Sequence, residues 1–225
     1  MRYLIILSVF VVQIFCVSVS GQTIEKKATP KNTGSELSFE KRLLAELNAA
    51  RSSPNEYLKK LEHQKTLISG KVLSVPGRPD VLMNEGIPAV DGAIEALKST
   101  TALGKLKISS GLMKVANAQF SDLKEDPSLG HYGKDGSDLT ARLNKFGVAG
   151  GAAENITNWE TTPDQVSISM LIDDGVPGRH HRQNVLNPKF SLFGASCGKV
   201  NSSKFICVVV FADKFVEGGK RLRSY

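Results

Sequence analysis

The sequence predicts an α+β domain in which helices come first and antiparallel strands follow. Five segments with helix signals lie between residues 42 and 175, and several of them repeat apolar residues at helical spacing. Two β-rich segments, 190–197 and 204–212, come late and flank a short turn. A parallel α/β fold would instead alternate strands with helices along the chain, so the order favours a layered α+β domain.

The first two expected helices are 42–51 and 53–61. The first is rich in strong helix formers. In the second, Ser53 stands at the N-cap position and Glu56 three residues later, which is the pattern of a capping box. Pro54 follows at the first helical position, where its missing N–H costs nothing.

The next two expected helices are 110–123 and 137–147, and apolar residues repeat on one face of each. Those residues are Leu112, Val115, Ala116, Phe120 and Leu123 in the first, and Leu139, Leu143 and Phe146 in the second. Gly147 is expected to end the second helix as a C-terminal cap.

The last expected helix, 161–175, carries mixed signals. Val166 and Ile168 alternate as they would in a strand, whereas Thr162 and Gln165 form a second capping box. The capping pattern decides for a helix, and Asp173 then shares a face with the apolar residues.

The late strands are expected to form a hairpin around the turn 198–203. In that register Cys197 and Cys207 face each other, and a disulfide between them would contribute roughly 2–3 kcal/mol, because the closed loop is short. Residues 152–157 form a weaker strand candidate, and residues 66–90, with several Gly and Pro, are interpreted as a loop.

The N-terminus has the pattern of a secretory signal peptide, residues 1–20. Arg2 precedes an apolar run, and Ser18 and Ser20 supply the small residues of a cleavage site. A retained N-terminal anchor is the alternative. Secretion is consistent with a disulfide and with an extracellular location.

The remaining chain is expected to comprise a disordered leader, 21–36, one domain, 37–216, and a basic tail, 217–225. The formal charge of +7 is mild, and no aromatic residues interleave the basic ones, so nucleic-acid binding is not expected. No later segment is long and apolar enough to span a bilayer. We expect a monomer.

Common catalytic motifs are absent or out of context. Residues 194–198, GASCG, match the nucleophile elbow, but a strand instead of a helix is expected to follow and no histidine lies downstream. The zinc-protease spacing H-E-x-x-H does not occur. His131, Glu154 and His181 are therefore the candidate functional residues, either as a metal site or as a hydrogen-bonded polar cluster.

Taken together, four stretches resemble the CAP superfamily of cysteine-rich secretory, antigen 5 and pathogenesis-related proteins (SCP-like domains). They are GHYGKDGSDLTARLNKFG, AAENIT, SMLIDDGVPGRHHRQNVLNPKFSLFGASCG and ICVVVFA, and the resemblance covers about residues 39–213. It implies a three-layer α-β-α sandwich with a central antiparallel sheet, and a cleft lined by two histidines and two acidic residues.

By this resemblance His131, Glu154 and His181 are cleft residues. The fourth position is usually a glutamate, and here Asp173 is the candidate, one methylene shorter. The resemblance implies that these four residues hold a divalent metal, for which zinc suits the imidazoles best.

Fold does not fix function, so three functions stay open. The first, which the lack of a nucleophile favours, is a non-enzymatic binding module for a lipid, a sterol or a protein partner. The second is a metal-assisted hydrolase with Glu154 as general base and His131 and His181 as ligands. The third is a purely structural secreted domain. Asn155 and Asn201 also begin sequons that a glycosylating host would use.

Overall fold

The computed structural model describes residues 37–218. The predicted signal peptide (1–20), the predicted leader (21–36) and the end of the predicted tail (219–225) lie outside the described residues. The domain limits at 37 and 216 stay predictions.

The described residues form helices and short strands in the expected order. The helices are α1 (Phe39–Ser52), α2 (Pro54–Thr66), α3 (Ile87–Ser99), α4 (Ser110–Glu125), α5 (Leu139–Phe146), α6 (Pro163–Ile172), the 3₁₀ turn η1 (Pro177–Arg179) and α7 (His180–Val185). The strands are β1 (Ile68–Ser69), β2 (Val72–Leu73), β3 (Val81–Leu82), β4 (Lys107–Ile108), β5 (Gly147–Ala149), β6 (Ala152–Asn158), β7 (Leu192–Lys199), β8 (Phe205–Ala212) and β9 (Phe215–Glu217).

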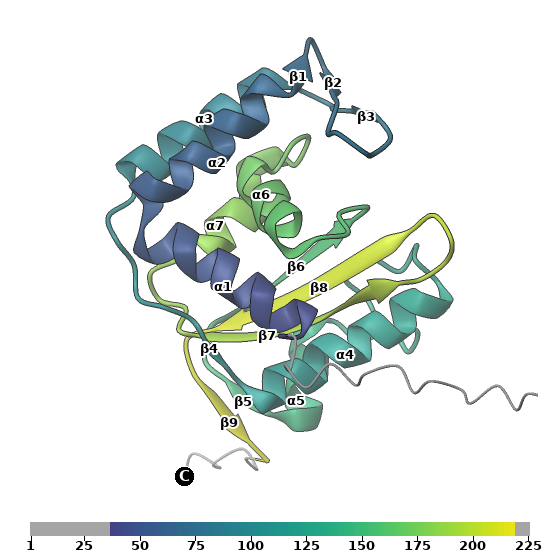
Figure 1. Cartoon of the computed structure of the whole chain (residues 1–225). Helices are drawn as coiled ribbons and strands as arrows, with labels where there is room; N and C mark the ends of the chain where they lie inside the picture. Colours follow the sequence, from purple (N-terminus) through teal and green to yellow (C-terminus); the bar gives the residue numbers. More distant parts are fainter. Residues whose placement is uncertain (1–36, 219–225) are drawn as a thin grey trace, which may run out of the picture. The chain divides into compact units, whose positions relative to one another are not determined.

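Helices cover both faces of the main sheet, as the three-layer expectation requires. Helices α1, α6 and α7 lie on one side, with α2 and α3 beyond them, and α4 and α5 lie on the other side (Figure 1). Strand β8 is buried along nearly its whole length because its alternate residues pack into two apolar clusters. Cys207, Val209 and Phe211 belong to the first cluster, and Ile206, Val208, Val210 and Ala212 to the second. The α+β class and the three layers are confirmed.

The main sheet has the order β4-β7-β8-β6, so β6 is an edge strand. Strands β6, β7 and β8 are antiparallel, as expected, but the two-residue strand β4 pairs with β7 in parallel. The chain reaches β7 from β4 only after four helices, which gives a parallel pair the long crossover that it needs.

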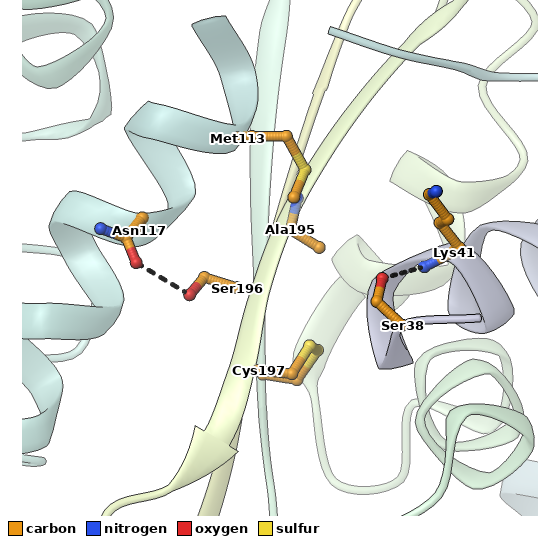
Figure 2. Close-up of a disulfide and its surroundings, with 8 residues drawn as sticks. Ser38, Lys41, Met113, Asn117, Ala195, Ser196 and Cys197 are labelled. Atoms are coloured by element: carbon orange, nitrogen blue, oxygen red, sulfur yellow. Dashed lines mark hydrogen bonds between the residues drawn. A yellow bond between two sulfur atoms is a disulfide. The ribbon is translucent and has the colours of Figure 1, made fainter. Parts of the chain in front are cut away.

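The predicted hairpin and disulfide are present in β7 and β8. Cys197 and Cys207 are direct Cα partners and their sulfur atoms are bonded. In the turn, the Oδ1 atom of Asn201 accepts the backbone N–H groups of Ser203 and Lys204 at 3.0 and 2.8 Å. Figure 2 shows Cys197 on the α1 side of the sheet, whereas the residue before it points to α4.

The structure confirms every helix expected from the sequence and adds α3 and the short α7. The segment 66–90, interpreted as a loop, contains the start of α3 and the two-residue strands β1, β2 and β3. The sequence does contain a helix pattern here, since Pro88 stands at the start of α3 and the buried residues of this helix recur with helical spacing. The glycines and prolines before it obscured the pattern.

Neither predicted capping box forms. The side chains of Ser53 and Thr162 make no cap hydrogen bond, although both helices begin where expected. Glu56 pairs with Lys59 instead, and Gln165 accepts from Arg78, so the partners that would complete the boxes are used elsewhere.

Gly147 ends α5 without the left-handed conformation expected of a cap. Its φ of 170° is extended, and the residue begins β5. A Cβ atom there would lie 2.3 Å from the carbonyl oxygen of Val216, so the glycine is required by the close approach of β9.

Candidate functional site

Asp173 and His181 form the first of two histidine–carboxylate pairs. Asp173 ends α6 in the left-handed conformation, which Asp tolerates better than most residues, and this turns its side chain towards the start of α7. Its Oδ1 atom lies 2.8 Å from Nδ1 of His181. Its Oδ2 atom accepts the backbone N–H groups of His181 and Arg182 at 2.9 and 3.2 Å. The carboxylate is fully buried and saturated with donors.

Glu154 and His131 form the second pair. The Oε1 atom of Glu154 lies 2.9 Å from Nδ1 of His131. The Nη2 atom of Arg142 donates to both carboxylate oxygens, at 2.9 and 2.7 Å, and the Arg142 and Glu154 side chains are almost wholly buried. Arg142 also donates to the carbonyl oxygens of His131 and Ser137, so one guanidinium holds both the carboxylate and the loop that carries the histidine.

Both pairs impose the same tautomer on the imidazole. An ionised carboxylate only accepts hydrogen bonds, so Nδ1 of His131 and of His181 carries the proton. In the neutral ring the lone pair is then on Nε2, on the side away from the carboxylate. Each histidine is thus oriented as a base or as a metal ligand.

The two pairs flank the edge strand β6 from opposite helical layers. Glu154 contacts Arg142 of α5, on one face of the sheet. The next residue, Asn155, points to the other face, where its amide donates to the carbonyl oxygen of His181 at 3.0 Å and accepts from Asn184 at 2.8 Å. Neighbouring residues of one strand therefore connect to both histidines.

The four predicted site residues are thus joined two by two. Within residues 37–218 no group of three or more His, Cys, Asp or Glu side chains is arranged to hold a metal. The carboxylate oxygens of Glu154 and Asp173 accept hydrogen bonds from Arg142, from backbone amides and from the histidines. This arrangement is typical of carboxylates that orient an imidazole through its second nitrogen.

A cavity of about 510 Å³ adjoins the Asp173–His181 pair. Its walls come from the β2–β3 segment, the C-terminal end of β6 and the inner face of α6, with His181 at one side. Apolar side chains dominate the β2–β3 wall, among them Leu82 and Met83, and α6 contributes Ile168 and Ile172 beside two polar residues. Polar and charged residues make up about half of the lining, so the cavity combines an apolar wall with a polar one. A concave site of this size is typical of small-molecule binding.

The mouth of this cavity exposes large apolar side chains. Val81 is 51% exposed, Leu82 77% and Trp159 63%, and all three line the cavity. Three such residues gathered at one opening form an apolar patch, which is characteristic of a binding surface. We call Val81, Leu82 and Trp159 the apolar rim.

The segment that carries Val81 and Leu82 is hydrogen-bonded to the turn before His181. Asp174 accepts the backbone N–H groups of Asn84, Glu85 and Gly86 at 2.6 to 3.2 Å. Arg179 donates to both oxygens of Glu85, and this hydrogen bond, with one from the backbone of Gly175, lowers the pKa of Glu85 to about 2. The cavity wall and the His181 turn are thus one connected unit.

Glu160 is the buried carboxyl of the cavity wall. Burial raises the pKa of Glu160 above its ordinary value, against the lowering influence of the Ser169 hydroxyl and of the Arg78 and His181 charges. Arg78 donates to Gln165 and to Thr161, so its guanidinium is held beside this wall.

Sequence reasoning missed Arg142, Asn155 as a site residue, and the cavity. Arg142 had no signal, because it occupies an ordinary position in an amphipathic helix. Asn155 was noted only as a glycosylation sequon, but it is fully buried and both ends of its amide are hydrogen-bonded, so this residue is unavailable to a glycosylating enzyme. Asn201 remains exposed in the hairpin turn.

A bacterial protein is similar to this chain in sequence. The uncharacterized protein YkwD of Bacillus subtilis (strain 168) is 28% identical over 115 residues, which are 49% of this chain and 43% of that protein. The chain therefore matches less than half the length of this relative.

Two solved structures are similar at lower identity. An outer surface protein from Borrelia burgdorferi is 22% identical, with a TM-score of 0.41 over 50% of this chain and 80% of that one. An extracellular protein containing an SCP domain from Bacillus anthracis str. Ames is 20% identical, with a TM-score of 0.39 over 54% and 37%.

None of the helices between residues 37 and 218 combines the length and the apolarity needed to cross a bilayer. Residues 44–211 match the cysteine-rich secretory protein family, CAP, which is three quarters of the chain. The resemblance seen in the sequence is therefore confirmed, and the chain belongs to the CAP family.

Proposed function

We propose that this CAP protein is a secreted, monomeric and non-enzymatic binding module that takes an apolar ligand, a lipid or a sterol, into the cavity beside His181. The observation that carries the proposal is the apolar rim, because its three exposed residues gather at the mouth of a cavity with an apolar wall. Exposed apolar area is removed from water only when something covers it, and each Å² covered contributes about 25 cal/mol.

The cavity walls support the same conclusion. The β2–β3 wall is fixed at one end by the Asp174 contacts and at the other by Arg78, which reaches the start of α6. A site held open by such contacts needs little rearrangement to bind, and this lowers the cost of association. A purely structural domain would not require such a cavity, so this feature favours binding over a structural role.

The hydrolase alternative asks Glu154 to act as a general base. Its side chain is 2% exposed, and Arg142 donates to both of its oxygens. A general base must reach the proton that it removes, and a carboxylate so deeply buried between a guanidinium and an imidazole is not accessible to a substrate. The geometry therefore favours binding over hydrolysis.

A zinc ion bound by His131 and His181 forms a second part of the proposal. The donor chemistry supports it, since each imidazole has Nδ1 bonded to a buried carboxylate and Nε2 left over. With the two carboxylates in orienting roles, the ion would complete its coordination with water or with a ligand group. Binding requires neutral imidazoles, so acid releases the metal.

The binding proposal is tested with butylbenzene, an apolar probe without a polar head, and Trp159 as reporter. Trp159 is the only tryptophan of the chain and belongs to the rim, so a change in its fluorescence reports on the cavity mouth. Val81→Asp should weaken binding about tenfold, because it places a charge where apolar surface is to be covered.

Val216→Asp is the matched control. Val216 is also a strand residue with a similar exposure, 63%, but it lies in β9 and not on the cavity wall. The control should bind butylbenzene as the parent does. An equal loss in both variants, or no fluorescence change in the parent, would show that the cavity is not an apolar binding site.

A further inference from the structure

Strand β6 has an outer edge that pairs with no other strand among residues 37–218. Two backbone hydrogen bonds fix which of its residues face β8. At its start, the N–H of Asp213 donates to the carbonyl oxygen of Gly151 at 3.0 Å, and beyond its end the N–H of Trp159 donates to that of Phe205 at 2.9 Å. The register between these bonds is continuous, so the odd-numbered residues of β6 direct their backbone groups to β8 and the even-numbered residues direct theirs outwards.

The outward residues are Ala152, Glu154, Ile156 and Asn158. Their backbone N–H and C=O groups make no hydrogen bond to another described residue. Proteins usually protect such an edge with lysine, proline or a bulge, whereas β6, with the sequence AAENITN, contains no lysine or proline and keeps an unbroken register. An edge without these features is a template for another strand.

This edge is open to solvent although helical layers flank the strand. The side chain of Glu154 is 2% exposed and the whole residue 9%, so most of its remaining surface belongs to the main chain. Ile156, Thr157 and Asn158 all line the cavity of about 510 Å³. Successive side chains point to opposite faces, and that of Ile156 packs into the second apolar cluster, so the cavity borders the edge of β6 and not only one face.

The outward backbone groups restrict what can bind along this edge. Donors and acceptors alternate along the four outward residues, and the pattern repeats every two residues, about 6.8 Å. An extended polypeptide carries the same alternation at the same repeat, whereas a lipid or a sterol has a single polar end. Main-chain pairing would supply affinity, and a pocket beside the edge would select a side chain.

A second copy of this chain fits the edge less well. On one face, Arg142 bonds both to Glu154 and to the loop that carries His131. On the other face, Asn155 bonds to His181 and Asn184 of α7. Only a strip between these two layers is open. A single extended chain fits such a strip, whereas the β6 strand of a second copy would bring its own flanking layers with it.

We propose that the outer edge of β6 binds an extended peptide as an added antiparallel strand, with an apolar side chain of the peptide opposite Thr157 in the cavity. Antiparallel pairing matches β6, β7 and β8 and is the more stable kind per residue. This inference goes beyond the proposed function, because strand pairing does not require that the cavity binds a lipid or a sterol.

The geometry predicts which amides of the peptide are used. Residues directly opposite on paired strands share a face, and Thr157 lies on the same face of β6 as Asn155, towards α7 and the cavity. Peptide residues opposite Thr157 and Asn155 therefore direct their side chains to the cavity and their N–H groups away from β6. The peptide residues between them donate to β6.

The test uses the peptide acetyl-KTLTVTK-amide, titrated into the full chain by calorimetry. Its leucine and valine should face the cavity, and its three threonines should donate to β6. N-methylation of the threonines should weaken binding at least about tenfold, because it removes the donors of the ladder. N-methylation of the leucine and the valine is the matched control, and it should change the affinity by less than about twofold.

Hydrogen exchange measured by NMR gives a direct readout of the same pairing. The amides of Ala152, Glu154, Ile156 and Asn158 should exchange faster in the free protein than those of Asn155, which is bonded to β8. With saturating peptide, the amides of Glu154, Ile156 and Asn158 should become protected, since these are the positions that the three threonines can reach.

Asn158→Pro tests the edge from the side of the protein. The N–H that it removes points outwards, and proline is tolerated at such positions of edge strands, so the domain should fold. The variant should weaken peptide binding about tenfold, because the ring replaces a hydrogen-bonding group of the edge. Asn158→Ser keeps the N–H and should bind the peptide as the parent does.

The outcomes decide between the possible occupants. If the peptide neither binds nor protects the outward amides, or if both methylation patterns weaken binding equally, strand addition is overturned. If the outward amides are already protected in the free protein and the chain sediments as a dimer, a second copy occupies the edge and the peptide proposal is wrong. Failure of butylbenzene to bind would contradict the proposed function and leave these results unaffected.

Discussion

The two histidine–carboxylate pairs reach the same arrangement by different means. In one, the carboxylate of Glu154 on strand β6 is held by a buried side-chain cation, Arg142 of α5. In the other, the Asp173 carboxylate is held by backbone N–H groups of the segment that also carries His181. His131 is 54% exposed and His181 18%. The first pair therefore depends on one distant residue, whereas the second is built into the end of a helix.

The largest expected effect concerns the first pair. Arg142→Met should destabilise the domain by about 3–5 kcal/mol, because it leaves the Glu154 carboxylate buried without its cation. Urea unfolding measures the change in free energy.

Two further variants control this result. Arg142→Met combined with Glu154→Gln should recover part of the loss, since no buried charge then remains. Lys145→Met, on the same helix, removes an exposed partner of Asp135 and should change the free energy by less than about 1 kcal/mol. A small effect of Arg142→Met would mean that Glu154 does not depend on that cation.

An intermediate effect is expected in the second pair. Asp173→Asn keeps the left-handed conformation accessible but removes the ionised acceptor of three hydrogen bonds, so it should destabilise by about 1–2 kcal/mol. If the carboxylate orients His181 for zinc, calorimetry should also show zinc affinity reduced at least about tenfold.

His181→Ala sharpens the same comparison, because it should abolish zinc binding without unfolding the domain. Asp164→Asn, in the first turn of α6, is the matched control and should leave zinc affinity unchanged. Zinc binding that survives both His131→Ala and His181→Ala would contradict the proposed ligand pair.

The smallest expected effect concerns the pair of Glu85 and Arg179, which connects the cavity wall to the turn before His181. Because the pKa of Glu85 is lowered to about 2, its pair with Arg179 stabilises the fold fully above the ordinary Glu pKa of about 4.3. This stabilisation is lost as the pH falls from there towards 2. The melting temperature of Glu85→Gln should therefore lie slightly below that of the parent near pH 6 and approach it near pH 2.

A difference between Glu85→Gln and the parent that stays constant across this pH range would show that the carboxylate of Glu85 is not preferentially ionised in the fold. The pair is only partly buried and contributes little in any case, since solvent and salt screen it.

The sequence was informative where a local pattern determines local structure. The apolar run of β8, the turn at Asn201 and the facing cysteines predict the hairpin, because all three act over a few residues. Helix α3 was missed although its periodicity is clear, since the preceding glycines and prolines dominated the interpretation.

The candidate site depends on contacts that no local pattern contains. The pairing of His131 with Glu154 joins residues on either side of α5, and Arg142 occupies a position that amphipathic spacing alone assigns to an ordinary helix face. Asp173 reaches His181 only because α6 ends in a left-handed residue. The resemblance selected four residues that the structure joins in two pairs, but which carboxylate holds which histidine follows from the tertiary structure.

The disulfide between β7 and β8 has a consequence for strand alignment. In most sheets one face is apolar and the other polar, so a slip of one residue exposes apolar side chains and is penalised. Strand β8 is buried on both faces, and Ile206, Val208 and Val210 differ little in polarity from Val209 and Phe211 between them. Hydrophobicity therefore distinguishes poorly between the two alignments. The bond between Cys197 and Cys207 admits only one, and it thereby determines which side chains of the central strand face each helical layer.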